Sequence, residues 1–68
     1  MIGKTVEFIE KDSNGDSVLR MAIVVDSILV SSRSGCAITH YVLQLVNQPK
    51  YRKSNIAIVH PSHIQSIL

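Results

Sequence analysis

The end of the sequence constrains the fold most, because a strand pattern, a proline turn and a second apolar segment follow one another there. Ile56 to Val59 form an alternating apolar segment, which predicts a strand. Pro61 to Ile64 are expected to form a single helical turn, with Ile64 directed into the core. The apolar end Ile67-Leu68 then predicts a closing strand, so the earlier segments must fold to receive these two strands.

The size of the chain limits its organisation to one domain. Its 68 residues predict a single domain over residues 1–68. Apolar residues make up 46% of the sequence and charged residues 18%, a composition that excludes a disordered chain. Because so small a domain has a thin core, we expect part of its apolar surface to be buried against a partner or another copy of the chain.

The charge and the cysteine content give weak indications about the binding partner and the cellular compartment. The net charge is +2 and the isoelectric point is near 9.0, which favours nucleic-acid binding only slightly. Cys36 is the one cysteine, so no internal disulfide can form, as is usual in a reducing cytosol. The first residues carry charges and no signal-peptide core, and the longest apolar run, Met21 to Val25, is too short to span a bilayer. The expectation is a cytoplasmic protein without membrane contact.

Period-two alternation predicts three further strands upstream of the tail. They are expected over residues 5–10, 18–30 and 38–46, with Asn14-Gly15 as a turn after the first. The second segment also has a helical alternative, although its apolar stripe would then contain Asp26. The β-branched cluster from Ile23 to Val25 favours a long strand, bent near Asp26.

The faces of these strands can be assigned from the same alternation. The expected core face of the second strand carries Leu19, Met21, Ile23 and Val25, and that of the third carries Tyr41, Leu43 and Leu45. Apolar residues also occupy the opposite face, at Ala22, Val24, Val42 and Val46. Two interpretations stay open for them: burial where the sheet folds over itself, or an oligomer or partner interface.

The segments together predict an all-β domain of five strands, with one 3-10 turn before the last strand. Five short strands protect their edges best by curling into a closed or nearly closed small barrel. The order of signals resembles an SH3-like barrel of the KOW/Tudor kind. The resemblance lies in Gly3 to Phe8, Met21 to Asp26, Tyr41 to Leu43, and Val59 to Ile67. It implies a shape and no particular activity.

One family with this kind of barrel is an enzyme, and its motif can be compared. The plasmid-borne type II dihydrofolate reductases resemble the chain in the same places, and their active pore uses Val-Gln-Ile-Tyr just before the closing turn. This sequence has Ala57-Ile58-Val59-His60 there, so the glutamine and tyrosine are missing and the activity is not carried over. With only Phe8, Tyr41 and Tyr51 as aromatic residues, a groove for proline-rich peptides or an aromatic cage is also disfavoured.

The candidate nucleic-acid site is the one basic cluster of the sequence. Cations that contact phosphates, beside a ring that can stack on a base, suit nucleic-acid binding. The predicted site consists of Lys50, Tyr51, Arg52 and Lys53, joined by Arg33 if the fold brings it to the same side.

Two other arrangements lack the partners that their chemistry requires. His60-x-x-His63 has the spacing of two metal ligands, but no second ligand pair accompanies it. Cys36 and His40 could form a nucleophile and base, but nothing in the sequence orients the histidine. We therefore expect no metal, no cofactor, no catalytic residue and no small-molecule substrate.

The sequence thus predicts a non-catalytic binding module that contacts nucleic acid through its basic loop. The alternative is a protein–protein interaction module, or a self-assembling accessory or inhibitor protein of a phage or mobile element, with a protein partner or a second copy as its target. The two functions are compatible with each other.

Overall fold

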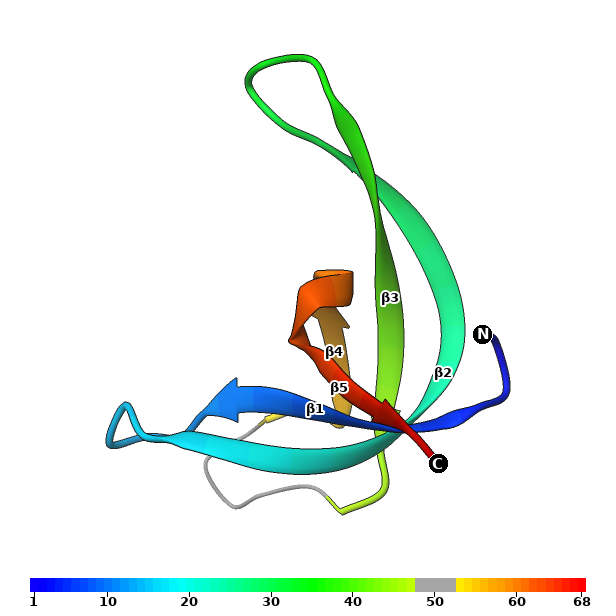
Figure 1. Cartoon of the computed structure of the whole chain (residues 1–68). Helices are drawn as coiled ribbons and strands as arrows, with labels where there is room; N and C mark the ends of the chain where they lie inside the picture. Colours follow the sequence, from blue (N-terminus) through cyan, green and yellow to red (C-terminus); the bar gives the residue numbers. More distant parts are fainter. Residues whose placement is uncertain (48–52) are drawn as a thin grey trace.

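The computed structural model describes residues 1–47 and 53–68, which form five strands and one 3-10 turn (Figure 1). The elements in chain order are β1 (Thr5–Lys11), β2 (Ser17–Ser31), β3 (Ala37–Leu45), β4 (Ile56–Val59), η1 (Pro61–His63) and β5 (Ile64–Ile67). The all-β class, the strand count and the turn before the last strand are therefore confirmed. In the described part of the chain no helix is long and apolar enough to cross a membrane.

The strands form one antiparallel sheet in the order β4-β3-β2-β1-β5. β4 and β5 are its two edges, and η1 carries the chain from one edge to the other. The predicted closed barrel is wrong, because the described strand pairings leave these edges unpaired with each other and the sheet stays open. Both edge strands are only four residues long. β4 pairs with β3, and β5 pairs with β1.

The long strand β2 is the centre of the sheet. It pairs with β1 through its first half and with β3 through its second half, and it curves strongly between them (Figure 1). The predicted strand and its bend are confirmed: the register against β3 shifts between Val24 and Asp26, which is a β-bulge. The helical alternative for this segment is therefore wrong.

The core lies on the concave side of the bent sheet. Its buried side chains are Val6, Phe8, Ala22, Val24, Leu43, Leu45, Ala57 and Val59, with Tyr41 and Ile64 packed against them. The predicted core face of β3 and the predicted inward direction of Ile64 are thus confirmed.

The predicted core face of β2 is wrong. Ala22 and Val24 are fully buried, whereas Leu19, Met21 and Ile23 are 57%, 46% and 41% exposed. Both alternating sets of β2 are apolar, so bulk alone does not decide which one turns inward. Cross-strand pairing decides it, because Ala22 pairs with Val6 on one side and with Leu45 on the other, and both of those are buried.

The turn after β4 is the single helical turn that Pro61 predicts. His60 has extended backbone angles and its Nδ1 accepts a hydrogen bond from the Ser62 amide at 3.1 Å, so it caps η1. Pro61 occupies the start of the turn, where a missing N–H costs nothing. Ile64 ends the turn and packs against the core as expected.

Candidate functional site

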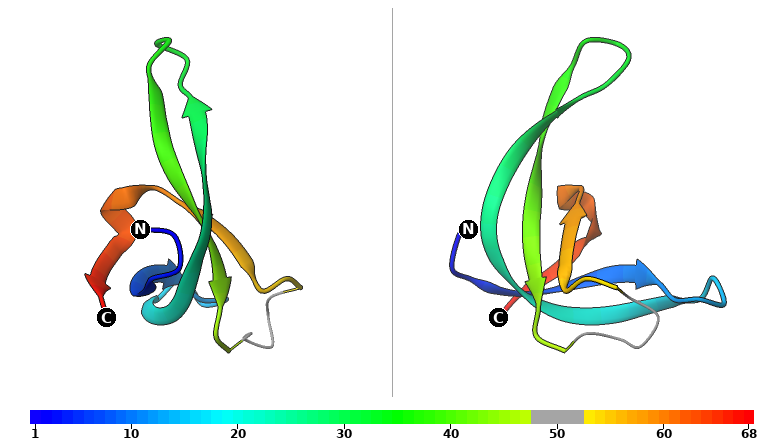
Figure 2. Two further views of the ribbon diagram at one scale, coloured as in Figure 1. Left: turned by 90° about the vertical axis from the view of Figure 1, so that its right-hand side faces the viewer. Right: turned by 180° about the vertical axis from the view of Figure 1, so that it is seen from behind.

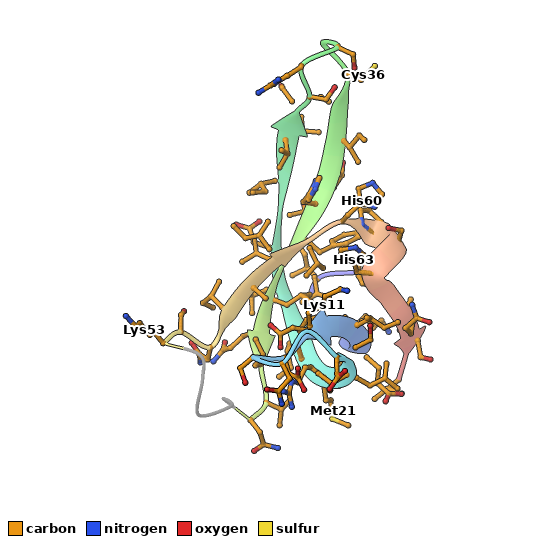
Figure 3. All side chains as sticks on the ribbon, turned by 90° about the vertical axis from the view of Figure 1, so that its left-hand side faces the viewer. Lys11, Met21, Cys36, Lys53, His60 and His63 are labelled. Atoms are coloured by element: carbon orange, nitrogen blue, oxygen red, sulfur yellow. The ribbon has the colours of Figure 1, made fainter. Side chains whose placement is uncertain are left out.

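The predicted basic site falls mostly outside the described residues. Lys50, Tyr51 and Arg52 lie in that gap, while Lys53 and Arg33 are described and exposed. Arg33 belongs to the tip of the β2–β3 hairpin, between Ser32 and Cys36, whose backbones are hydrogen-bonded at 2.8 Å. Cys36 and Lys53 lie at different ends of the molecule (Figure 3), so Arg33 does not extend a patch that starts at Lys53. The nucleic-acid site stays a prediction that rests on the consecutive residues of the loop.

An exposed apolar surface, with Gln44 in its middle, lies on the side of the sheet that faces away from the core. We call it the outer face; its members are Leu19, Met21, Ile23, Val46, Ile56 and Ile58, all exposed by 41% or more. Strand register makes them neighbours: Ile23 lies opposite Gln44, which in turn lies opposite Ile56. Val46 donates a backbone hydrogen bond to Met21 at 3.0 Å, so the outer face crosses β2, β3 and β4.

The sheet therefore has a second apolar face, as predicted, but most of its residues differ from the predicted ones. Val46 is exposed as the interface interpretation requires, and Val42 is partly buried. Ala22 and Val24 are in the core, and Leu19, Met21 and Ile23 take their place on the surface. The charged residue nearest this surface in register is Glu7, which pairs with Met21 across β1 and β2.

A second exposed apolar surface lies on the β2–β3 arm, the part of the hairpin from Val25 to His40. The arm stands away from the rest of the sheet in every view (Figure 2). Its apolar side chains are exposed on both faces, with Leu29 at 71%, Ile38 at 41%, Val30 at 40% and Ile28 at 38%. No part of the described chain covers them. The sequence carried a signal for this surface, since Ile28-Leu29-Val30 continues the apolar pattern of β2 beyond the length that β1 can pair.

Two grooves accompany the open sheet. One has a volume of about 450 Å³ and lies between the end of β1 and β4; Phe8, Ile58 and His63 are among its lining residues. The other has a volume of about 410 Å³ and lies along β5, between Met1, Tyr41 and Ile67. Both are lined mainly by aliphatic side chains and backbone, so they offer shape and apolar contact to a ligand.

The three histidines lie together beside the middle of β3 and around η1. The ring centroids of His40 and His60 are 5.3 Å apart and nearly perpendicular. Those of His60 and His63, which are labelled in Figure 3, are 6.4 Å apart. His60 Nδ1 is used by the η1 cap, and His40 Nδ1 lies 3.1 Å from the Ile38 carbonyl oxygen. Among the described residues, no three His, Cys, Asp or Glu side chains are placed to hold a metal ion.

Two further polar features have structural partners, and one, the Cys36 thiol, is free. Arg20 and Glu10 form an ion pair between β2 and β1, with Nε and Oε2 3.3 Å apart. Asp12 Oδ1 accepts hydrogen bonds from the amides of Asn14 and Asp16, both at 2.9 Å, which fixes the β1–β2 turn. Cys36 is a free, exposed thiol at the hairpin tip. The ion pair and the Asp12 hydrogen bonds stabilise a strand pair and a turn.

Comparison with protein-family models, curated proteins and solved structures gave no match for this chain. The candidate site therefore rests on the geometry described above.

Proposed function

We propose that the protein is a non-catalytic, SH3-like binding module that binds another protein through its outer face. The strand order and the 3-10 turn between the edge strands support the SH3-like assignment. The observation that carries the function is the outer face itself, an exposed apolar surface that spans three strands of a very small domain. Contiguous exposed apolar surface in a small domain marks an interaction site.

The chemistry of the outer face fits a protein partner. The fully buried centre of a protein interface is apolar and poor in charged residues, with polar groups at its rim. The outer face has aliphatic side chains and Met21 around the uncharged Gln44, and Glu7 lies at its β1 border. Met21 also suits such a surface, because an unbranched thioether side chain adapts to the shape of a partner.

Affinity capture with single-residue variants tests this function. Met21→Lys and Ile58→Lys place a charge on the outer face at positions that are 46% and 56% exposed, so the fold should be retained. We expect a protein partner captured by the wild type to be lost from both variants, because an unpaired charge is costly in an apolar interface. Lys53→Glu is the matched control outside the outer face and should keep the partner. Identical capture by all four proteins would contradict the proposal.

Nucleic-acid binding is the second candidate, and a specific feature of the sequence favours it. Lys50, Tyr51, Arg52 and Lys53 are consecutive, so their closeness does not depend on the fold. We propose that this loop contacts phosphates through its cations and stacks Tyr51 on a base. Fluorescence anisotropy with single-stranded and duplex oligonucleotides tests it. Binding should weaken steeply with salt and be lost in the double variant Arg52→Glu/Lys53→Glu, whereas Arg33→Glu should leave it unchanged.

The same proposal includes where such a module acts. A free, exposed thiol at Cys36 suits a reducing compartment, and we place the protein in the cytosol. A domain of 68 residues without a recognisable catalytic motif fits the accessory and inhibitor proteins of phages and mobile elements, which act by binding. An unmodified Cys36 thiol in protein isolated from its host would agree with this placement, and an intermolecular disulfide would contradict it.

A further inference from the structure

The β2–β3 arm leaves one edge of β2 open. β1 pairs with β2 only from Ser17 to Ile23, and backbone hydrogen bonds with Gly3 and Lys4 extend this contact to Val24. Beyond Val24, the described strand pairings of β2 are with β3 alone, through Ser31. The other edge of this segment therefore has no strand beside it among the described residues. An exposed, apolar strand edge of this length is a template for pairing with another chain.

The direction of the backbone groups at this edge follows from the hairpin. Ser32 donates its amide hydrogen to the Cys36 carbonyl, so the backbone groups of Ser32 face β3. In an antiparallel ladder these directions alternate, so Val30 and Ile28 also face β3. The amide and carbonyl groups of Leu29 and Ser31 therefore point out from the open edge, where another strand can pair with them. The Ser27 carbonyl points the same way, while the Ser27 amide donates a local hydrogen bond to Asp26 Oδ1 at 2.8 Å.

The sequence along this edge is self-complementary. Residues 27 to 31 read Ser-Ile-Leu-Val-Ser, which has the same pattern of residue types in both directions about Leu29. An antiparallel copy centred on Leu29 would place Leu29 opposite Leu29, Ile28 opposite Val30, and Ser27 opposite Ser31. Apolar side chains would then meet apolar ones on each face, and small hydroxyl side chains would meet each other, as favourable cross-strand pairs require.

We propose that two copies of this chain pair through the β2–β3 arms, with the open edge of β2 antiparallel to its copy about a two-fold axis at Leu29. The pairs Leu29–Leu29 and Ser27–Ser31 would be the hydrogen-bonded ones, because their backbone groups point outward. The Ser27 amide would exchange its local bond to Asp26 Oδ1 for one to the Ser31 carbonyl of the other copy. The arms then form one continuous sheet across the dimer, and apolar side chains cover each other at the junction. This interface uses the arm and is independent of the outer face, to which the proposed function assigns a different protein.

The size of the exposed surface agrees with a missing partner. The chain exposes 4688 Å², whereas a compact monomer of this mass would expose about 4,200 Å². Its radius of gyration is 12.3 Å, against about 11 Å for a compact domain of this length. A standard interface buries about 800 Å² on each partner, so the excess area already amounts to about half of what a stable dimer needs.

The arm also lacks the features that keep strand edges apart. Proteins protect open edges with lysine, proline or inward-pointing charges. Residues 25 to 32 contain Asp26 as their one charged residue and no proline. The bulge beside Val24 bends β2 at the base of the arm, which leaves Ser27 to Ser31 as a regular strand available for pairing.

Disulfide cross-linking tests both the interface and its register, in a Cys36→Ser background with diamide as the oxidant. Leu29→Cys should give covalent dimers in high yield, because opposite residues of a hydrogen-bonded pair have Cα atoms about 5.5 Å apart, within disulfide range. Ser27→Cys and Ser31→Cys should each cross-link far less alone, yet form a mixed dimer when combined. Leu19→Cys is the matched control, on the same strand but outside the arm.

The outcomes separate this inference from the proposed function. Absence of a Leu29→Cys dimer at about 100 µM protein, where a micromolar dimer is almost fully formed, overturns the inference. Cross-linking at Leu19→Cys with none at Leu29→Cys also overturns it, and would show that copies meet through the outer face instead. Loss of partner capture in Met21→Lys and Ile58→Lys bears on the proposed function alone, because those residues lie outside the arm.

Discussion

His60 stabilises the turn that takes the chain from one edge of the sheet to the other. Its Nδ1 accepts the Ser62 amide hydrogen at 3.1 Å, which occupies an amide that the turn leaves without a backbone partner. His60→Ala should lower the free energy of unfolding by about 1 kcal/mol, as measured by urea denaturation. His60→Asn restores a capping acceptor and should recover most of this loss. Equal destabilisation by both variants would show that the cap is not the cause.

Two leucines of similar appearance in the sequence differ in what they contribute to stability. Leu43 is fully buried and Leu19 is 57% exposed. Leu43→Ala should therefore cost about 2–5 kcal/mol of unfolding free energy, whereas Leu19→Ala should change it by about 0.5 kcal/mol or less. Urea denaturation at low protein concentration measures both. A larger loss for Leu19→Ala than for Leu43→Ala would contradict the observed orientation of β2.

These residues also show how far the sequence determines the core. On β3, Gln44 separates Leu43 from Leu45, so polar alternation identifies the inner face correctly. On β2, both alternating sets from Leu19 to Val24 are mostly apolar, and the bulkier set is the natural choice for a core. The small Ala22 is buried instead, because it lies between two buried partners on the neighbouring strands. That pairing is a long-range property, and the sequence pattern of one strand does not contain it.

Among the elements, the β2–β3 arm makes the clearest prediction about dynamics. In the monomer, the outward amides of Leu29 and Ser31 should exchange with solvent faster than those of Ile28 and Val30, which face β3. Raising the protein concentration should slow exchange at these two outward amides selectively, because the second copy occupies them. Hydrogen exchange by NMR measures each amide. Concentration-independent exchange at Leu29 would contradict pairing at this edge.

Elements whose bounds depend on neighbouring residues in the sequence are predictable from it. Elements whose bounds depend on pairing with a strand far away in the sequence are less predictable. The η1 turn follows from Pro61, and β4 is predicted with its observed bounds because its alternation is short and regular. The final strand was expected at Ile67-Leu68 but begins at Ile64, because Ile64 both ends the turn and pairs with Phe8. The strands of the arm are predicted to within one residue, at 18–30 and 38–46, whereas its projection from the sheet is not predicted, since it depends on where β1 stops pairing with β2.

At the scale of the molecule, the open sheet explains why so much apolar surface is exposed. Strand propensity and strand order indicate a barrel, but closure needs pairing between two edges that are far apart in sequence. The four-residue β4 and β5 do not meet, and a groove remains between β1 and β4. The sheet therefore has a core on its concave side and apolar residues on its convex side and along the arm. Association is the physical means of covering such surfaces.

The solution mass over a dilution series tests the central claim that the apolar arm is an association surface. Light scattering from about 1 to 100 µM spans the range in which a micromolar dimer forms. The wild type and Leu19→Lys should approach twice the chain mass of 7.5 kDa at high concentration, and Leu29→Lys should stay at 7.5 kDa because two like charges would meet at the axis. A wild-type mass of 7.5 kDa at every concentration would contradict the claim.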